Sequence, residues 1–240
     1  MKINLSKRLK EIVNLCDNSK KIIDIGTDHA LVPISLILNN KCNHVIASDL
    51  REGPLEFAKK NIKKFNLETK ISIKMSDGLE NFTDDDLLDV NQIIISGMGG
   101  ENIISIIEKK IHKIKENTVF ILQPQTNIEL LRTWLLNNNI QIIAEKFLSE
   151  NNKFYQIIKA RKVDFKMNDL DDLEMIVGIS PIIDIEYIYF LERKIESLIK
   201  MRESLEKSQK LLLDDISIIN SKIFKLNEYL KKVKDDYESS

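Results

Sequence analysis

Five short motifs place glycines, carboxylates and amides directly after apolar runs that are typical of strands. In chain order they are DIGTDHA (24–30), the Asp49 that ends HVIASD, SDG (76–78), SGMGG (96–100) and LQPQ (122–125). Because the carboxyl ends of parallel strands meet at one edge of an open α/β sheet, we expect the five motifs to converge on one cleft. Such a cleft would bind a ligand through bare backbone and charged side chains.

The first motif departs from a dinucleotide-binding turn. Such a turn has further glycines where this chain has Asp28, His29 and Ala30, and its helix N-terminus faces a pyrophosphate. A carboxylate at Asp28 would repel that group, which argues against NAD or FAD and so against a dehydrogenase. S-adenosylmethionine has no phosphate and carries an ammonium and a sulfonium, so acidic groups suit it. We expect Asp24 or Asp28 to bind the ammonium and Gly26 to let the backbone approach the ligand. Asp28 as the N-cap of the next helix is compatible with that role.

The next two motifs supply carboxylates at neighbouring strand ends. Asp49 lies 23 residues beyond Gly26, where a carboxylate accepts hydrogen bonds from ribose hydroxyls, whether of NAD or of S-adenosylmethionine. Asp77 is placed to accept from an adenine amino group, with Gly78 making room. The SDG triplet is also a common turn, so its value lies in its position after a third strand.

The last two motifs differ in chemistry. SGMGG holds three of the seven glycines of the chain, and we expect its loop to face the ligand and to open a helix whose N–H groups point into the cleft. In LQPQ, the amide of Gln123 and the carbonyl of Pro124 can pair with the edge of a base. The alternative for LQPQ is a helix start marked by proline.

The elements that must position these motifs read as βα units. From Lys20 to about Lys162, apolar runs alternate with segments of helical period, which is typical of helices around a mostly parallel sheet. The predicted parallel strands are 21–26, 44–49, 71–77, 92–97 and 119–124. Two closing strands, 140–148 and 153–162, are joined by SENN and predict an antiparallel hairpin. By analogy this is the layout of a class I methyltransferase, although a flavodoxin-like or dinucleotide-binding sheet opens similarly.

Composition narrows the class of protein. With 240 residues, 43% of them hydrophobic, the chain can fill a core. Its net charge of −1 gives no sign of a highly charged tail that would bind nucleic acid or a membrane. It has no apolar run long enough for a bilayer and no signal-peptide segment at its start, so we expect a cytoplasmic protein with no membrane partner. Cys16 and Cys42 lack neighbours at metal-ligand spacing and are expected to be buried thiols, with no metal site.

The C-terminal region carries heptads. After an acidic linker at about 163–172, taking Ile188 as position a makes twelve of the fourteen a and d sites apolar through Val233, which predicts a coiled coil. Either one long helix dimerises with another chain, or a hairpin turns near 208–215. We therefore expect a methyltransferase-type domain at 1–163, a helical coiled-coil domain at 164–240, and a monomer or a coiled-coil dimer.

Taken together, LSKRL near the start, DIGTDHA, SDGLE, GMGG and LQP occur in an order that resembles the bacterial tRNA (adenine(22)-N1)-methyltransferase family over most of the first 160 residues. The resemblance implies a Rossmann-like class I methyltransferase domain with a mostly parallel seven-stranded sheet, followed by a coiled-coil domain. It implies methyl transfer from S-adenosylmethionine to N1 of adenine 22 in the D-arm of tRNA. The cofactor-binding positions that it implies are Asp24, Gly26, Asp28, His29, Asp49, Asp77, Gly78, Gly97, Met98 and Gly99. The family motif LQPN is here LQPQ, which leaves the role of Gln125 open.

Methylation at N1 of adenine needs no strong base, because N1 has an in-plane lone pair. The enzyme must instead position the base and exclude water, and the base must be unpaired or flipped into the cleft. A carboxylate or carbonyl would ease the positive charge that develops on the base, and Asp28, Gln123 and the Pro124 carbonyl are the catalytic candidates. His29 has no step assigned to it. Basic clusters such as Lys59, Lys60, Lys63 and Lys64 serve either as tRNA contacts or as solvated helix faces.

Two alternatives remain open from the sequence. One is a methyltransferase that acts on a protein or a small molecule, because the cofactor motifs allow it equally. The other is a non-catalytic assembly protein that dimerises through its heptads and keeps a relic cofactor cleft. Binding of S-adenosylmethionine separates the second alternative from the enzymes, and salt-dependent binding of tRNA separates the first.

Overall fold

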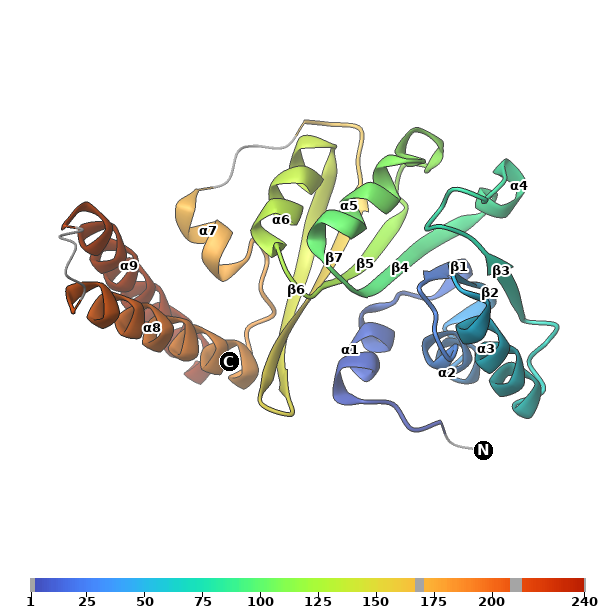
Figure 1. Ribbon diagram of the computed structural model, residues 1–240, viewed down its shortest axis with the longest axis horizontal. Coiled ribbons are helices and arrows are strands. Elements are labelled where there is room, and N and C mark those ends of the chain that lie inside the picture. Colours follow the sequence, from blue (N-terminus) through green and yellow to red (C-terminus); the bar gives the residue numbers. More distant parts are fainter. Residues whose placement is uncertain (1–2, 167–170, 208–212, 240) are drawn as a thin grey trace.

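The computed structural model describes residues 3–166, 171–207 and 213–239. A twisted sheet carries helices on both faces, and a pair of long helices lies beside the last strands (Figure 1). The strands are β1 (Ser19–Ile25), β2 (Cys42–Asp49), β3 (Ile71–Met75), β4 (Val90–Met98), β5 (Val119–Pro124), β6 (Ile140–Glu150) and β7 (Lys153–Lys162). Their order across the sheet is β3-β2-β1-β4-β5-β7-β6. The first five strands are parallel, and β7 runs antiparallel to both β5 and β6. The predicted mostly parallel seven-stranded sheet is confirmed.

This strand order creates a switch point between β1 and β4. The chain moves from β1 outward to β2 and β3, and then crosses to the other side of β1 to form β4. The crossover connections on the two sides therefore diverge above the carboxyl ends of β1 and β4, and ligands of open α/β sheets bind in such a crevice.

Helices cover the two faces of the sheet in separate groups. One face packs against α1 (Lys7–Leu15), α2 (Leu31–Leu38) and α3 (Glu52–Lys64). The other packs against α4 (Asp84–Leu87), α5 (Gly100–Glu108), the 3-10 turn Ile111–Lys113 and α6 (Ile128–Asn137). Consecutive residues of β1 show the division, because Ile22 packs into the first group and Ile23 into the second. Parallel strands buried on both faces need apolar residues at successive positions, which is why these strands were readable as apolar runs.

The hairpin between β6 and β7 turns on two asparagines. Asn151 and Asn152 have φ values of 51° and 60°, as a two-residue type I′ turn requires. Ser149 and Glu150 pair with β7 and belong to β6. The predicted four-residue connector SENN was therefore too long by two residues.

A buried ion pair fixes the chain that leaves the sheet. Arg132 of α6 and Glu145 of β6 are 1% and 0% exposed, with Nη2 and Oε2 at 2.7 Å. Arg132 Nη1 also donates to the carbonyl of Met175 in α7 (Asp172–Val177), and the Ile179 N–H donates to Glu145 Oε1. The ion pair thus joins α6, β6 and the segment that leads to the C-terminal helices. The boundary between residues 163 and 164 stays a prediction.

Two helices of the same chain pair in the C-terminal region. α8 (Ile185–Glu206) and α9 (Leu213–Glu238) pack through heptad positions, of which Leu191 and Leu226 are fully buried. This arrangement corresponds to the hairpin alternative within one chain, while its predicted turn lies partly at 208–212, outside the described residues.

The start of α8 is tied to the hairpin and to the first helix. Glu186 accepts hydrogen bonds from the N–H and the hydroxyl of Ser149 at 2.8 and 2.9 Å, and it forms an ion pair with Lys7 of α1. α8 therefore begins at the same end of the sheet as the carboxyl ends of β1 and β4.

Candidate functional site

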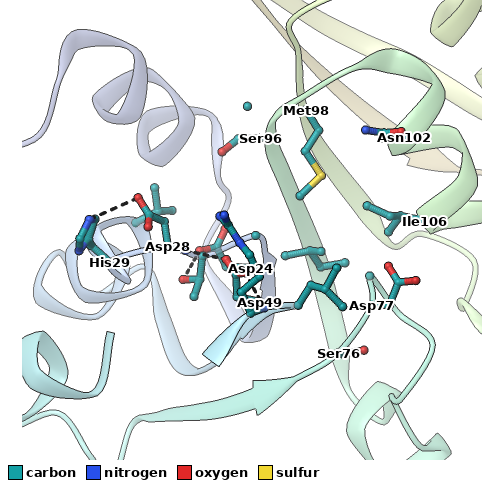
Figure 2. Close-up of a pocket in the computed structure, with 18 of the residues that line it drawn as sticks. Asp24, Asp28, His29, Asp49, Ser76, Asp77, Ser96, Met98, Asn102 and Ile106 are labelled. Atoms are coloured by element: carbon teal, nitrogen blue, oxygen red, sulfur yellow. Dashed lines mark hydrogen bonds and ion pairs between the residues drawn. The ribbon is translucent and has the colours of Figure 1, made fainter. Parts of the chain in front are cut away.

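A cavity of about 720 Å³ opens at the switch point of the sheet. Its walls come from the ends of β1, β2 and β4, the loops after β3 and β5, the first turn of α2, one side of α5 and the helix α1. Figure 2 shows Asp24 and Asp49 close together in the middle of the cavity, Asp77 beside Ile106, and Met98 above them. The expected convergence of the motifs is largely confirmed, and the exceptions are described below.

Asp24 is the buried acid of the cavity. Its side chain is 4% exposed, and Thr27 Oγ1 donates a hydrogen bond of 2.7 Å to Asp24 Oδ2. Burial raises the pKa of Asp24 from 3.8 to about 7, Thr27 opposes that rise, and the charge of Asp49 adds to it. A cationic group in the cavity would stabilise the ionised carboxylate, so Asp24 suits an ammonium ligand.

The loop after β1 is built from left-handed residues. Gly26 has φ +72°, a backbone conformation that favours glycine, and an added Cβ would displace the flexible end of Met98, whose Cε would lie 2.5 Å away. Asp28 has φ +50°, and its carboxylate lies 3.5 Å from His29 Nε2. Both side chains line the cavity. Asp28 does not cap the next helix, because α2 begins at Leu31 and its N-cap is Ala30; that prediction was wrong.

Asp49 is held in place by backbone donors. The N–H groups of Asp28 and Arg51 donate to the two oxygens of Asp49 at 3.3 and 3.1 Å, and the residue is 7% exposed. The carboxylate therefore has a fixed orientation at the end of β2, beside the cavity. This is the placement expected for binding a pair of ribose hydroxyls.

Asp77 faces the cavity but carries a cationic partner. Lys109 Nζ donates to its carboxylate at 3.0 Å, and this hydrogen bond raises the pKa of Lys109. Next to it Gly78 has φ +57°, and a Cβ would meet Ile106 at 2.8 Å. The SDG motif is thus a turn that both lines the cavity and packs against α5.

The three glycines of SGMGG divide into two roles. Gly97 (φ +77°) and Met98 line the cavity as predicted. Gly99 is not among the lining residues, because it faces the β5–α6 loop, where a Cβ would lie 3.0 Å from Thr126 Oγ1. A Cβ on Gly100 would lie 2.5 Å from the Asn127 carbonyl oxygen. The prediction that the whole loop faces the ligand is corrected, since two of its glycines serve packing.

Gln123 and Pro124 do not reach the cavity. Gln123 is fully buried, its Oε1 accepts from Arg8 Nη1 at 2.7 Å and from the Gly97 N–H at 3.2 Å, and its Nε2 donates to the Pro124 carbonyl at 2.8 Å. The Gln123 amide and the Pro124 carbonyl therefore hydrogen-bond to each other. The prediction that these two groups face the base is corrected. Gln125 lines the cavity in their place.

Sequence reasoning missed several lining residues. Some of them lie inside a motif but were not predicted as site residues, and the others lie outside the five motifs. They are Arg8, Thr27, Ser96, Asn102, Ser105, Ile106 and Lys109. The helical spacing of the residues that follow SGMGG would have placed Asn102, Ser105 and Ile106 along one side of α5. Arg8 belongs to LSKRL, a motif to which the sequence analysis assigned no role in the cavity.

Two absences apply to the described part of the chain. Within 3–166, 171–207 and 213–239, no group of three or more His, Cys, Asp or Glu side chains is arranged to hold a metal ion. No helix in those same ranges is long and apolar enough to cross a membrane. Cys16 and Cys42 are buried, and burial raises the pKa of each thiol to about 12.

The chemistry of the donor set fits S-adenosylmethionine. Asp24 offers a partner for the ammonium, Asp49 a fixed acceptor for the ribose, and Gly26 and Gly97 bare backbone between them. Met98 and Ile106 give an apolar wall on which a base can lie.

Comparisons with known proteins agree with this geometry. Residues 5–158 match the family model described as a methyltransferase domain. The chain is 34% identical over 162 residues to the tRNA (adenine(22)-N(1))-methyltransferase of Bacillus subtilis, covering 68% of this chain and 67% of that protein. It resembles the structure of M. capricolum TrmK in complex with the cofactor product S-adenosyl-homocysteine, with a TM-score of 0.78, 30% identity and coverage of 95% and 99%. It also resembles the structure of a protein in the NADB-Rossmann superfamily from Streptococcus agalactiae, with a TM-score of 0.80 and 28% identity. That match covers 96% of this chain and 99% of the other.

Proposed function

Because the chain belongs to the tRNA (adenine(22)-N1)-methyltransferase family, we propose that it methylates N1 of adenine 22 in tRNA with S-adenosylmethionine as methyl donor. One observation of the structure supports the proposal above the others. Ordered carboxylates and bare glycines surround the switch-point cavity, and its first loop has an acid where a dinucleotide site binds phosphate.

The cofactor-binding roles follow from the cavity. Asp24 binds the ammonium, Asp49 accepts from the ribose hydroxyls, and Asp77 with Gly78 borders the adenine. When bound, the cofactor supplies an electrophilic methyl group that adenine N1 can take up through its lone pair. The protein's contribution is to orient the base and to keep water from the cavity.

Asp28 is the proposed catalytic residue. Its carboxylate lies in the cavity, and 64% of its side chain remains exposed, so a base can approach it. As N1 gains a bond, positive charge spreads over the adenine ring and acidifies the N6 amino group. The Asp28 carboxylate stabilises that charge and can accept the N6 proton. We place the base edge beside Gln125, the LQPQ side chain that lines the cavity.

The proposed partner is tRNA, and the proposed compartment is the cytoplasm, where tRNA is modified in bacteria. We propose a monomer as the working unit, because the heptad faces of α8 and α9 are already buried against each other within one chain. The rival that dimerises through its heptads would need those same faces for a second chain.

Two tRNA transcripts that differ only in A or G at position 22 test the function. After incubation with protein and S-adenosylmethionine, the RNA is digested to nucleosides and analysed by mass. We expect 1-methyladenosine only from the A22 transcript. Labelling of both transcripts would contradict the target site. Cofactor binding without labelling of either would favour a methyltransferase with another substrate, and absence of cofactor binding would favour an assembly protein.

A further inference from the structure

The rim of the cavity carries an exposed aromatic pair. Phe57 of α3 is 54% exposed, and its ring centre lies 5.2 Å from that of His29, with an angle of 58° between the two planes. His29 lines the cavity with its side chain partly exposed, and Figure 2 shows it on the side away from Ile106. A single exposed phenylalanine needs no explanation, but this ring stands only one side chain away from the site.

Contacts along α3 fix the pair and add a cation to it. Asn61 Nδ2 donates to the His29 carbonyl at 2.9 Å, which fastens the β1–α2 loop to α3. Lys60 Nζ lies 5.7 Å from the centre of the Phe57 ring, within the range of a cation–π contact. Because Phe57, Lys60 and Lys64 are spaced by three and four positions, they share one side of the helix.

The charge of this surface suits a polyanion. Lys60, Lys63 and Lys64 are exposed, and within the residues that the structure describes none of the three forms an ion pair. Glu56, next to the ring, is already neutralised by its ion pair with Lys59. Aromatic rings beside unpaired cations are typical of surfaces that bind single-stranded nucleic acid, because bases stack on the rings while the cations contact phosphates.

The proposed substrate brings such a strand to this rim. A target adenine that enters the cavity has to leave its stack, so the nucleotide next to it loses a stacking neighbour. The sugar–phosphate chain on either side of the adenine must then cross the rim of the cavity. An acidic peptide would also suit the lysines, but the proposed reaction brings none to the cavity, whereas it always brings the strand that carries the target base.

We propose that the ring of Phe57, with His29 beside it, stacks the nucleotide next to the target adenine. Lys60, Lys63 and Lys64 bind phosphates of the same strand. The proposal rests on the proposed function, since it assumes that the cavity takes up an adenine from tRNA. It adds a surface, outside the cofactor cavity, that holds the strand while the base is turned inward.

The stacking contact is tested with one change in the protein and one in the RNA. Binding of a labelled A22 transcript is measured by fluorescence anisotropy on the full chain, with S-adenosyl-homocysteine present. Phe57→Ala should weaken binding about tenfold, and so should an abasic site on one side of adenine 22. Because both changes remove the same contact, combining them should weaken binding no further. Phe165→Ala is the control, since Phe165 is also exposed but follows β7 at the opposite end of the strands.

The lysines are tested through the salt dependence of the same binding. In the triple variant Lys60→Gln, Lys63→Gln, Lys64→Gln, the slope of log Kd against log salt should fall by about one for each phosphate contact that is lost. A second triple variant loses the same number of charges near the amino-terminal ends of β1, β3 and β5, and its slope should stay close to that of wild type. It carries Lys20→Gln, Lys70→Gln and Lys115→Gln, all at exposed lysines.

Three results overturn the proposal. One is an effect of Phe57→Ala that adds to that of the abasic site on both sides of adenine 22, or no effect at all. The second is an equal change of slope in the two triple variants. The third is weaker binding of S-adenosyl-homocysteine to Phe57→Ala, which would place the ring in the cofactor site. If neither the ring nor the lysines affect tRNA binding, the surface is left for a protein partner such as an acidic peptide.

Failure of the proposed function gives a different result. A wild-type protein that binds S-adenosyl-homocysteine and tRNA but makes no 1-methyladenosine refutes the function. A wild type that methylates the A22 transcript, with binding that ignores Phe57→Ala, refutes only the stacking surface. Thermal melting of each variant shows that the fold is retained.

Discussion

The hydroxyl of Thr27 donates a 2.7 Å hydrogen bond to the carboxylate of Asp24, at a buried position where the pKa of Asp24 is nevertheless raised to about 7. Desolvation thus outweighs the hydrogen bond, and the unliganded site holds a carboxyl group that is close to half protonated at neutral pH.

Cofactor binding should therefore depend on pH. An ammonium beside Asp24 lowers its pKa, so binding releases a proton, and affinity should rise with pH up to about 7 and level off above it. Calorimetry with S-adenosyl-homocysteine from pH 5.5 to 8.5 measures this slope. Asp24→Asn should bind more weakly at pH 8 and show a flat profile, whereas His29→Gln, the control at a neighbouring side chain of the β1–α2 loop, should keep the slope. A flat wild-type profile would contradict the role of Asp24.

The same raised pKa has an opposite effect on the unliganded fold. The native state holds the proton more tightly than the unfolded chain, where the carboxyl has a pKa near 3.8. The contribution of Asp24 to stability is therefore present below about pH 4 and is lost as pH rises through about 7. Without ligand, Asp24→Asn should melt at a higher temperature than wild type at pH 8, and the difference should shrink at pH 5.

The role of Asp28 can be separated from cofactor binding. Asp28 has φ +50°, and asparagine tolerates that conformation, so Asp28→Asn removes the charge with little backbone cost. We expect kcat to fall about tenfold or more, with the Kd for S-adenosyl-homocysteine nearly unchanged. Asp89→Asn is the matched control, because Asp89 is exposed, lies outside the cavity and has φ +60°. A change in Kd alone would instead assign Asp28 to the ammonium.

The packing role of the SGMGG loop predicts that Gly100 is more costly to replace by alanine than Gly53 of α3, which is the control. Gly100→Ala places a Cβ 2.5 Å from the Asn127 carbonyl oxygen and should destabilise the protein by about 1–3 kcal/mol. Gly53, in α3, has nothing beyond its chain neighbours within 4 Å of an added Cβ, and it precedes Pro54, which disfavours the helical conformation for a residue with a Cβ. Gly53→Ala should therefore change the stability by less than about 1 kcal/mol. Urea unfolding compares the two. If Gly100→Ala is as stable as wild type but loses cofactor, the loop faces the ligand after all.

The buried ion pair should be costly to break and cheap to replace. Arg132→Met leaves Glu145 buried without its partner and should lower the free energy of unfolding by about 3–5 kcal/mol. The double variant Arg132→Met with Glu145→Leu should recover part of that loss. Arg193→Met, which breaks an exposed pair with Glu196, should change it by less than about 1 kcal/mol. If the losses caused by Arg132→Met and by Glu145→Leu alone add up to the loss of the double variant, the two groups do not interact.

The sheet was readable from the sequence because of where its strands lie. Strands covered on both faces must be apolar at successive positions, and β5 begins and ends where its apolar run indicated. The turn at Asn151 and Asn152 was harder to place, since the predicted connector included two residues that extend β6.

The residues that line the cavity were harder to predict from the sequence, because burial and long-range contacts decide which side chains reach it. Gln123 follows a strand like a ligand residue, yet it pairs with Arg8 across 115 positions of sequence, which no local pattern reveals. Gly99 and Gly100 looked like ligand contacts because glycine marks a close approach of any kind, and here the approach is to the β5–α6 loop.

The helix pair of α8 and α9 extends the molecule well beyond the cavity. α8 has 22 residues and so spans about 33 Å, starting where Glu186 meets Ser149 and Lys7 and extending away from the sheet (Figure 1). A free nucleoside can occupy the cavity but is far too short to reach the distal end of α8. A substrate that touched both places would have to be about as long as this helix, so contact with α8 would distinguish a long substrate from a free nucleoside that carries the same base.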